Sequence, residues 1–237
     1  LSPYFLTKLN FANLFVQAAQ LTTLAIALVF VLVIAEIDLS AGVAAGVAMD
    51  VFYLTTTFGV PWPIGLVSAL LVGVVLGFAI GFFVAKIGVP SFVITLAFFL
   101  GLQGVALILL GDGGLFRVEV PEVRAIMNDN LPVWGGWWLL AIVVLVSAGM
   151  GLYDRYRRTA SRLVNRPLSL LLIKLAFITA VGGGVVYVLN LNRSASVKEI
   201  SGVPIVIPIV LLIIFLGTFL LDRTKFGRHL YAVGGNP

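Results

Sequence analysis

The chain has 237 residues, of which 61% are apolar and 11% charged, against about 45–50% and about 25% in an ordinary soluble domain. This composition excludes a soluble enzyme. At about 20 residues per membrane crossing, the length accommodates seven or eight helices but no additional folded aqueous domain. The net charge of +5 comes without a basic patch carrying interleaved aromatics, so nucleic acid is not an expected partner. The absence of cysteine excludes disulfides and thiolate chemistry.

Charge, proline and glycine divide the apolar sequence into seven predicted crossings. The runs are continuous, whereas strands of a membrane barrel are about 10 residues long with alternating polarity. We therefore expect an all-α polytopic bundle that forms a single transmembrane domain over residues 1–237. The crossings are predicted at 14–35, 39–57, 61–85, 91–110, 133–153, 168–191 and 204–221. A Gly-Val-Pro tripeptide at 59–61, 88–90 and 202–204 predicts a proline in the first turn of three of these helices.

The distribution of Lys and Arg predicts the orientation. Nine of the 15 fall in alternate connections, at 36–38, 86–90, 154–167 and 222–237, and five fall in the others. Cytoplasmic loops carry the excess of cations, so the N-terminus is expected outside and the C-terminus inside. Lys174 lies within a crossing and is expected to extend to the headgroups. An external start without a leader, and a turn-rich stretch at 226–237, predict a fragment that lacks an earlier helix.

The side chains that membrane enzymes require are missing from the crossings. The single histidine, His229, lies in the predicted cytoplasmic tail, and the chain contains no HExxH, GxSxG or GxxxxGK[ST] motif. We therefore expect no catalytic residue, metal or cofactor in this chain. ATP hydrolysis, if it drives the protein, belongs to a separate subunit.

Two carboxylates, Glu36 and Asp38, interrupt the apolar sequence between the first two crossings. One interpretation is that Asp38 or Ser40 caps the second helix by accepting from a free backbone N–H. The other is that the break faces a transport path or a partner subunit, where acids near membrane depth find partners. The two interpretations are compatible.

Two stripes of side chains give candidate solute contacts. On the fourth crossing Phe92, Thr95, Phe99 and Gln103 are spaced by three or four residues and share a face. Rings with hydroxyl and amide groups suit a neutral polyhydroxy solute, but Thr95 and Gln103 would equally serve to bond neighbouring helices. Gln17 and Gln20, with Thr23, form a comparable stripe on the first crossing.

Small residues recur every four positions along the second and third crossings. Gly42, Gly46 and Asp50 share one face of the second, and a longer series continues on the third, at positions 65, 69, 73, 77, 81 and 85. Small residues in register allow helices to approach closely. This pattern predicts a packing face.

The external connection at 111–132 is longer than a simple turn requires. It predicts either a docking site for an external protein or an amphipathic turn lying on the surface. Trp134, Trp137 and Trp138 follow directly, as in an interfacial aromatic belt.

Three stretches, in order along the chain, resemble the permease subunits of bacterial monosaccharide ABC importers, the ribose, xylose and galactose group. They are Glu-Ile-Asp-Leu-Ser-Ala-Gly at 36–42, Gly-Val-Pro-Ser-Phe-Val-Ile-Thr-Leu at 88–96, and Phe-Gly-Arg with Tyr-Ala-Val-Gly-Gly-Asn between 226 and 236. The arginine-rich segment at 154–167 and the helix pair around it are similar to the xylose-type permeases. Gln103 and Asp50 depart from the pattern, because an Arg and a small neutral residue are usual there.

The resemblance implies a permease in the bacterial inner membrane that forms a homodimer, receives sugar from an extracytoplasmic binding protein and works by alternating access with cytoplasmic ATPase subunits. It implies a substrate path at Asp38, Ser40, Phe92 and Thr95. It also implies an ATPase-coupling region that leads into a coupling helix after the chain ends, with residues Gly227, Arg228, Gly234, Gly235 and Asn236. The alternatives are an ion-coupled secondary transporter using Glu36, Asp38 and Asp50, an ABC permease for another small polar solute, and a membrane scaffold that moves no solute.

Overall fold

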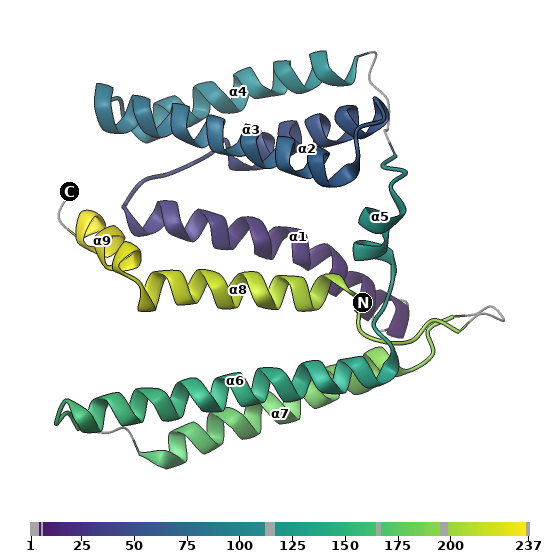
Figure 1. Ribbon diagram of the computed structural model, residues 1–237, viewed down its shortest axis with the longest axis vertical. Helices are drawn as coiled ribbons and strands as arrows, with labels where there is room; N and C mark the ends of the chain where they lie inside the picture. The colour runs from purple at the N-terminus through teal and green to yellow at the C-terminus, as the bar shows by residue number, and fades with distance from the viewer. Residues whose placement is uncertain (1–4, 6, 112–116, 165–166, 195–198, 236–237) are drawn as a thin grey trace. The chain divides into compact units, whose positions relative to one another are not determined.

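The computed structural model describes residues 5, 7–111, 117–164, 167–194 and 199–235, and the apolar segments are all helical (Figure 1). Its helices are α1 (Lys8–Val33), α2 (Ala41–Thr57), α3 (Trp62–Phe82), the π-helical turn η1 (Phe83–Ile87), α4 (Ser91–Leu110), α5 (Pro121–Asn128), α6 (Val133–Ala160), α7 (Leu168–Asn190), α8 (Val206–Arg223) and α9 (Lys225–Gly234). In the described ranges, extended backbone pairs only at an isolated bridge between Asn130 and Pro204. The predicted all-α class is confirmed.

Six of the helices are long and apolar enough to cross a membrane: α1, α3 with η1, α4, α6, α7 and α8. The seventh predicted crossing corresponds to α2, an apolar helix of 17 residues. At 1.5 Å per residue, α2 is about 26 Å long, slightly less than the hydrocarbon thickness of about 30 Å. The polytopic bundle is therefore built from six long helices and one shorter one.

Two helix ends and one further helix differ from the prediction. The first helix begins at Lys8 and not at 14, and α6 continues to Ala160, beyond the predicted end at 153. Hydropathy locates where a chain leaves the membrane, whereas Arg is a good helix former in water, so the helix continues into the first half of the arginine-rich segment. The stretch predicted to be turn-rich after residue 226 is instead helix α9.

The Gly-Val-Pro tripeptides form turns with a shared backbone conformation. Gly59, Gly88 and Gly202 have φ values of 82°, 79° and 99°, a left-handed region that glycine enters without steric cost. Pro61 and Pro90 stand at the N-cap positions of α3 and α4, one residue before the first turn that was predicted for them. At 59–61 and 88–90 the tripeptide thus ends one helix with its glycine and starts the next with its proline. The prediction is wrong for the third tripeptide, because Pro204 lies in the isolated bridge with Asn130, two residues before α8 begins.

The chain forms two compact units. The first comprises residues 1–19 and 125–209, and its centre is the pair α6 and α7. An added Cβ would lie 2.7 Å from Val203 at Gly136, 2.4 Å from Leu171 at Gly151 and 2.5 Å from Leu140 at Gly182, so these glycines allow the close packing. Four buried residues pack together as a hydrophobic cluster in this unit: Ala12, Val186, Leu189 and Val203.

The second unit comprises residues 20–124 and 210–237. Helix α2 packs against both α3 and α4, and a Cβ at Gly217 of α8 would lie 3.0 Å from Ile26 of α1. The predicted small-residue face is open on α2, where a Cβ at Gly42 or Gly46 would meet no atom within 4 Å. It is packed at the start of α3, since a Cβ at Gly65 would lie 2.9 Å from the Thr55 hydroxyl. Further along α3, a Cβ at Gly73 or Gly77 would meet no atom within 4 Å.

Candidate functional site

The candidate site begins where α1 ends, in the second compact unit. Ala35 adopts a left-handed φ of 62°, and the N–H groups of Glu36 and Ala35 donate to the carbonyls of Val31 and Leu32 at 3.3 and 3.0 Å. These are the two hydrogen bonds of a Schellman motif, which satisfies the last carbonyls of a helix. The first helix therefore stops sharply, and the chain has no regular secondary structure between Glu36 and the start of α2 at residue 41.

Asp38 fixes the entry to α2. One oxygen of its carboxylate, Oδ1, accepts from the backbone N–H and from the hydroxyl of Ser40, each at 2.7 Å. Ser40 occupies the N-cap position, but its side chain accepts no hydrogen bond from the helix. The carboxylate therefore holds the residue that precedes the helix, in the manner of an Asx turn, instead of capping a free N–H in the first turn. Ser40 has an exposed fraction of 0%.

The same segment is tied to the start of α4. Ile37 donates its N–H to the hydroxyl of Ser91 at 3.3 Å, and its carbonyl accepts from the hydroxyl of Thr95 at 3.2 Å. The Thr95 hydroxyl also lies 2.8 Å from the Ser91 carbonyl and 3.4 Å from the Phe92 carbonyl, and since it carries one proton, the three carbonyls share it. Thr95 is 1% exposed. We call the group Ile37, Asp38, Ser40, Ser91 and Thr95 the junction.

The structure brings together the parts of two sequence motifs that were predicted separately. Asp38 and Ser40 bond each other, and Thr95 bonds the carbonyl of Ile37, the residue before Asp38, across 58 residues of sequence. Of the other candidates, Phe92 contributes only its backbone carbonyl, which lies 3.4 Å from the Thr95 hydroxyl. Phe92 is 52% exposed and Phe99 is half-buried, and three amides are exposed on α1 and α4: Gln17, Gln20 and Gln103.

The chemistry of the junction is that of hydroxyls, backbone amides and carbonyls, and the half-buried carboxylate of Asp38. Within the residues that the structure describes, no group of three or more His, Cys, Asp or Glu side chains could hold a metal ion. Such a set can donate and accept hydrogen bonds. It suits a neutral polar ligand or a conformational contact between helices.

Helix α9 contains most of the residues implied in ATPase coupling, and it contacts the end of α1 next to this site. Thr224 caps α9 by accepting from the N–H of Gly227 at 3.2 Å, and a Cβ at Gly227 would lie 2.0 Å from the carbonyl oxygen of Leu221. A Cβ at Gly234 would lie 1.9 Å from the carbonyl oxygen of Val33, at the end of α1. Both glycines are therefore required by close contact with backbone. Arg228 and Gly235 are exposed, and Asn236 lies outside the described residues.

A second buried polar group, in the first compact unit, was not predicted from the sequence. Arg193 follows α7, is 9% exposed, and donates to the carbonyl of Leu189, to Oδ1 of Asn130 at 3.0 Å and to the carbonyl of Gly202 at 3.0 Å. Burial lowers the pKa of its guanidinium, although Arg stays charged in proteins. We call Arg193 and these three acceptors the clasp. Its partners lie up to 63 residues away in the sequence, so no local sequence pattern predicts them.

Comparison with known proteins places the chain in a family. Residues 10–237 match the family described as branched-chain amino acid transport system / permease component. The chain belongs to this permease family. Together with its six long apolar helices, membership makes it a multi-pass protein of the inner membrane, and no solved structure matches it.

The permease is also similar to curated proteins. It is 32% identical to the xylose transport system permease protein of Haemophilus influenzae, over 98% of this chain and 60% of that protein. With the protein of the same name from Escherichia coli K12, identity is 31% over 98% of this chain and 57% of that protein. The autoinducer 2 import system permease protein of Photorhabdus luminescens is 30% identical over 56% of this chain and 40% of that protein. The permease thus spans about 60% of the length of the xylose proteins it matches.

Proposed function

We propose that the permease is the membrane-spanning subunit of an ATP-driven importer that moves xylose or a related monosaccharide by alternating access. The observation that carries the proposal is the similarity to two xylose transport system permease proteins across 98% of the chain. The chain itself supplies no phosphate-binding loop for ATP, so the energy comes from separate ATPase subunits. The other partners are a second copy of the permease and an extracytoplasmic sugar-binding protein.

The junction is the part of the permease that we assign to the moving path. It joins the break between α1 and α2 to the start of α4 through hydroxyl and backbone groups. These groups bond the hydroxyls of a sugar as readily as they bond one another. Breaking or forming the hydrogen bond between Thr95 and Ile37 would favour one helix arrangement over another.

Helix α9 is the element that we assign to ATPase coupling. Its Gly234 rests on the carbonyl of Val33, three residues before Glu36 and five before Asp38. A displacement of α9 therefore pushes on the end of α1, where the chain turns into the junction. The bound nucleotide can shift this equilibrium only by its difference in affinity between the two arrangements.

Two other functions have support in specific observations. Half-buried carboxylates at Glu36, Asp38 and Asp50 are the groups that an ion-coupled secondary transporter would use. The similarity to an autoinducer 2 import permease supports a small polar solute other than a monosaccharide. Both are outcomes of the experiment below.

The proposal is tested by uptake into proteoliposomes that contain the permease with its ATPase subunits and binding protein. We expect labelled xylose to accumulate only when ATP is supplied to the ATPase side, and a protonophore to leave the rate unchanged. Uptake that ignores ATP and collapses with the protonophore would assign the protein to the secondary transporters. A panel of pentoses, hexoses and autoinducer 2 in the same assay identifies the solute.

A further inference from the structure

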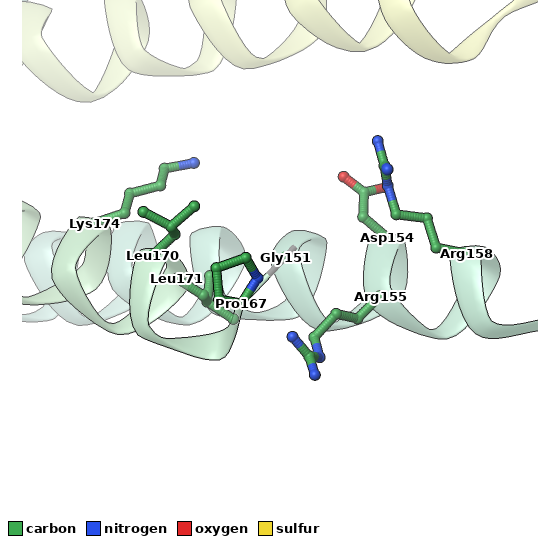
Figure 2. A pocket seen from close by; sticks show the side chains of 8 residues that line it. All are labelled: Gly151, Asp154, Arg155, Arg158, Pro167, Leu170, Leu171 and Lys174. Carbon is green, nitrogen blue, oxygen red and sulfur yellow. The ribbon is translucent and has the colours of Figure 1, made fainter. Parts of the chain in front are cut away.

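The α6–α7 hairpin, in the first compact unit, carries a basic cavity near its turn. The cavity has a volume of about 230 Å³, many times the 10–15 Å³ that one water requires. It is lined by Gly151, Asp154, Arg155, Arg158, Pro167, Leu170, Leu171 and Lys174 (Figure 2). Three cations thus stand against one carboxylate, and the cavity carries a net positive charge.

The side chains are arranged so that two cations reach the same side. Figure 2 shows Arg158 and Lys174 extending to one side of the hairpin together with Asp154, while Arg155 extends to the other. Between them lie Pro167 and Leu171. Arg158 comes from the last turn of α6 and Lys174 from the second turn of α7. The two cations therefore approach from different helices and can contact one anion from two directions.

The start of α7 adds to the positive potential of the cavity. Pro167 is the N-cap residue of α7, and its side chain offers no hydrogen bond to the first turn. The free N–H groups of a helix N-terminus carry a partial positive charge that favours anions. A cationic pair beside a helix start is the arrangement that binds a phosphate group.

The length of α6 places this cavity at headgroup depth. Trp134 and Trp138 are exposed at the start of α6, as in the aromatic belt at a membrane surface. Arg155 follows Trp134 by 21 residues, about 31 Å along a helix, and the hydrocarbon core is about 30 Å thick. The cavity therefore lies at the opposite membrane surface, which the distribution of cations predicts to be cytoplasmic.

Exposed apolar side chains lie beside the cavity on both helices. Leu152 on α6 and Leu170 and Ile173 on α7 are 55%, 54% and 63% exposed. In a membrane such side chains contact acyl chains, while a cationic cavity between helices at the cytoplasmic side suits an acidic headgroup. We propose that this cavity binds the phosphate of an anionic phospholipid headgroup in the leaflet that the arginine-rich segment faces.

The test compares two variants that lose the same charge from the same hairpin. R158Q/K174Q removes the two cations that converge on the cavity. R157Q/R162Q removes two cations of the same arginine-rich segment that do not line it. Lipid binding is measured by native mass spectrometry of the purified permease titrated with phosphatidylglycerol or with phosphatidylcholine, after circular dichroism has shown unchanged helix content.

We expect the wild type to retain phosphatidylglycerol in preference to phosphatidylcholine. R158Q/K174Q should bind phosphatidylglycerol at least tenfold more weakly, and R157Q/R162Q within twofold of the wild type. D154N, which removes the one acid, should strengthen binding, a gain that a misfolded protein would not give. Equal losses in both double variants would mean that cations attract the lipid without a site, and would overturn the proposal.

Two further arms separate the other sources of an anion. Inorganic phosphate at millimolar concentration should fail to displace phosphatidylglycerol, because it has no acyl chains to contact Leu170 and Ile173. Displacement by phosphate alone would make this a site for a free anion and contradict the lipid assignment. R158Q/K174Q that keeps its lipid but no longer binds the ATPase subunits would reassign the cavity to protein docking.

Discussion

The junction and the clasp are both buried polar groups, one in each compact unit. They offset the free-energy cost of burying polar atoms with different kinds of hydrogen bond. The clasp uses one long cation whose guanidinium donates to three oxygens, so a single side chain holds three segments. The junction uses short hydroxyls, and the Thr95 proton is shared among three carbonyls at 2.8, 3.2 and 3.4 Å. A hydroxyl that has an alternative acceptor can change its partner at little cost, whereas removing the partners of a buried charge costs several kcal/mol. We therefore expect the clasp to stabilise the fold and the junction to change its hydrogen bonds when the helices move.

The largest expected change in stability comes from removing the clasp. R193M leaves the carbonyls of Leu189 and Gly202 and Oδ1 of Asn130 without their donor, which we expect to cost about 3 kcal/mol. R193K keeps the charge but lacks the planar fork, and should recover only part of the loss. Thermal unfolding followed by tryptophan fluorescence checks this. An unfolding temperature for R193M equal to that of the wild type would contradict a structural role for Arg193.

The next largest effect is expected where α9 contacts the end of α1, the contact on which the proposed coupling to the ATPase depends. G234A places a Cβ 1.9 Å from the Val33 carbonyl oxygen, and since backbone cannot yield as a side chain does, α9 must move, at about 1–3 kcal/mol. G235A is the control, because its Cβ lies 3.1 Å from the nearest atom. Hydrogen exchange of the α9 amides should speed up in G234A alone. If the α9 amides exchanged at the same rate in both variants, the claim that α9 is held against the end of α1 would be contradicted.

A smaller change in stability is expected at the junction itself. T95V keeps the approximate volume and removes the hydroxyl that the Ile37 carbonyl uses, at a net cost of about 1 kcal/mol. T95S retains the hydroxyl and should stay closer to the wild type. The check is a denaturant titration of the three proteins in the same detergent. A loss for T95V as large as that for R193M would remove the distinction between the two groups.

The smallest effect is expected at the residue that ends α1. Ala35 has a φ of 62°, a left-handed conformation that costs a residue with a Cβ about 1–2 kcal/mol. A35G removes that cost but adds freedom to the unfolded chain, so we expect a net stabilisation of about 0.5 kcal/mol. R162G, at the end of α6 with a φ of 55°, should behave alike. Destabilisation by A35G in a denaturant titration would mean that the methyl group packs usefully.

The sequence predicts the helices better than it predicts their ends. Continuous apolar runs are enough to locate α1 to α4 and α6 to α8, because the membrane demands them. They do not show that α6 continues to Ala160 or that α9 is helical, since outside the membrane hydropathy no longer separates helix from turn. In α9 the glycines at 227 and 234 read as turn signals, but they serve close contact with backbone.

The candidate site was predictable where motif residues act locally. Asp38 and Ser40 are two residues apart and bond each other, which a break between apolar runs indicates. The bond from Thr95 to Ile37 spans 58 residues, so the sequence gives Thr95 as a candidate but not its partner. Arg193 was missed altogether, because its acceptors are backbone carbonyls and an amide with no distinguishing pattern around them.

The central claim is that the junction serves transport whereas the clasp serves stability, and ATP-driven uptake per folded molecule tests it most directly. The assay uses T95V and R193M in proteoliposomes, below the unfolding temperature of both. A loss of about 1 kcal/mol from one arrangement shifts its population about fivefold. We therefore predict a several-fold fall in uptake for T95V and wild-type uptake for R193M. Wild-type uptake by T95V would contradict the account.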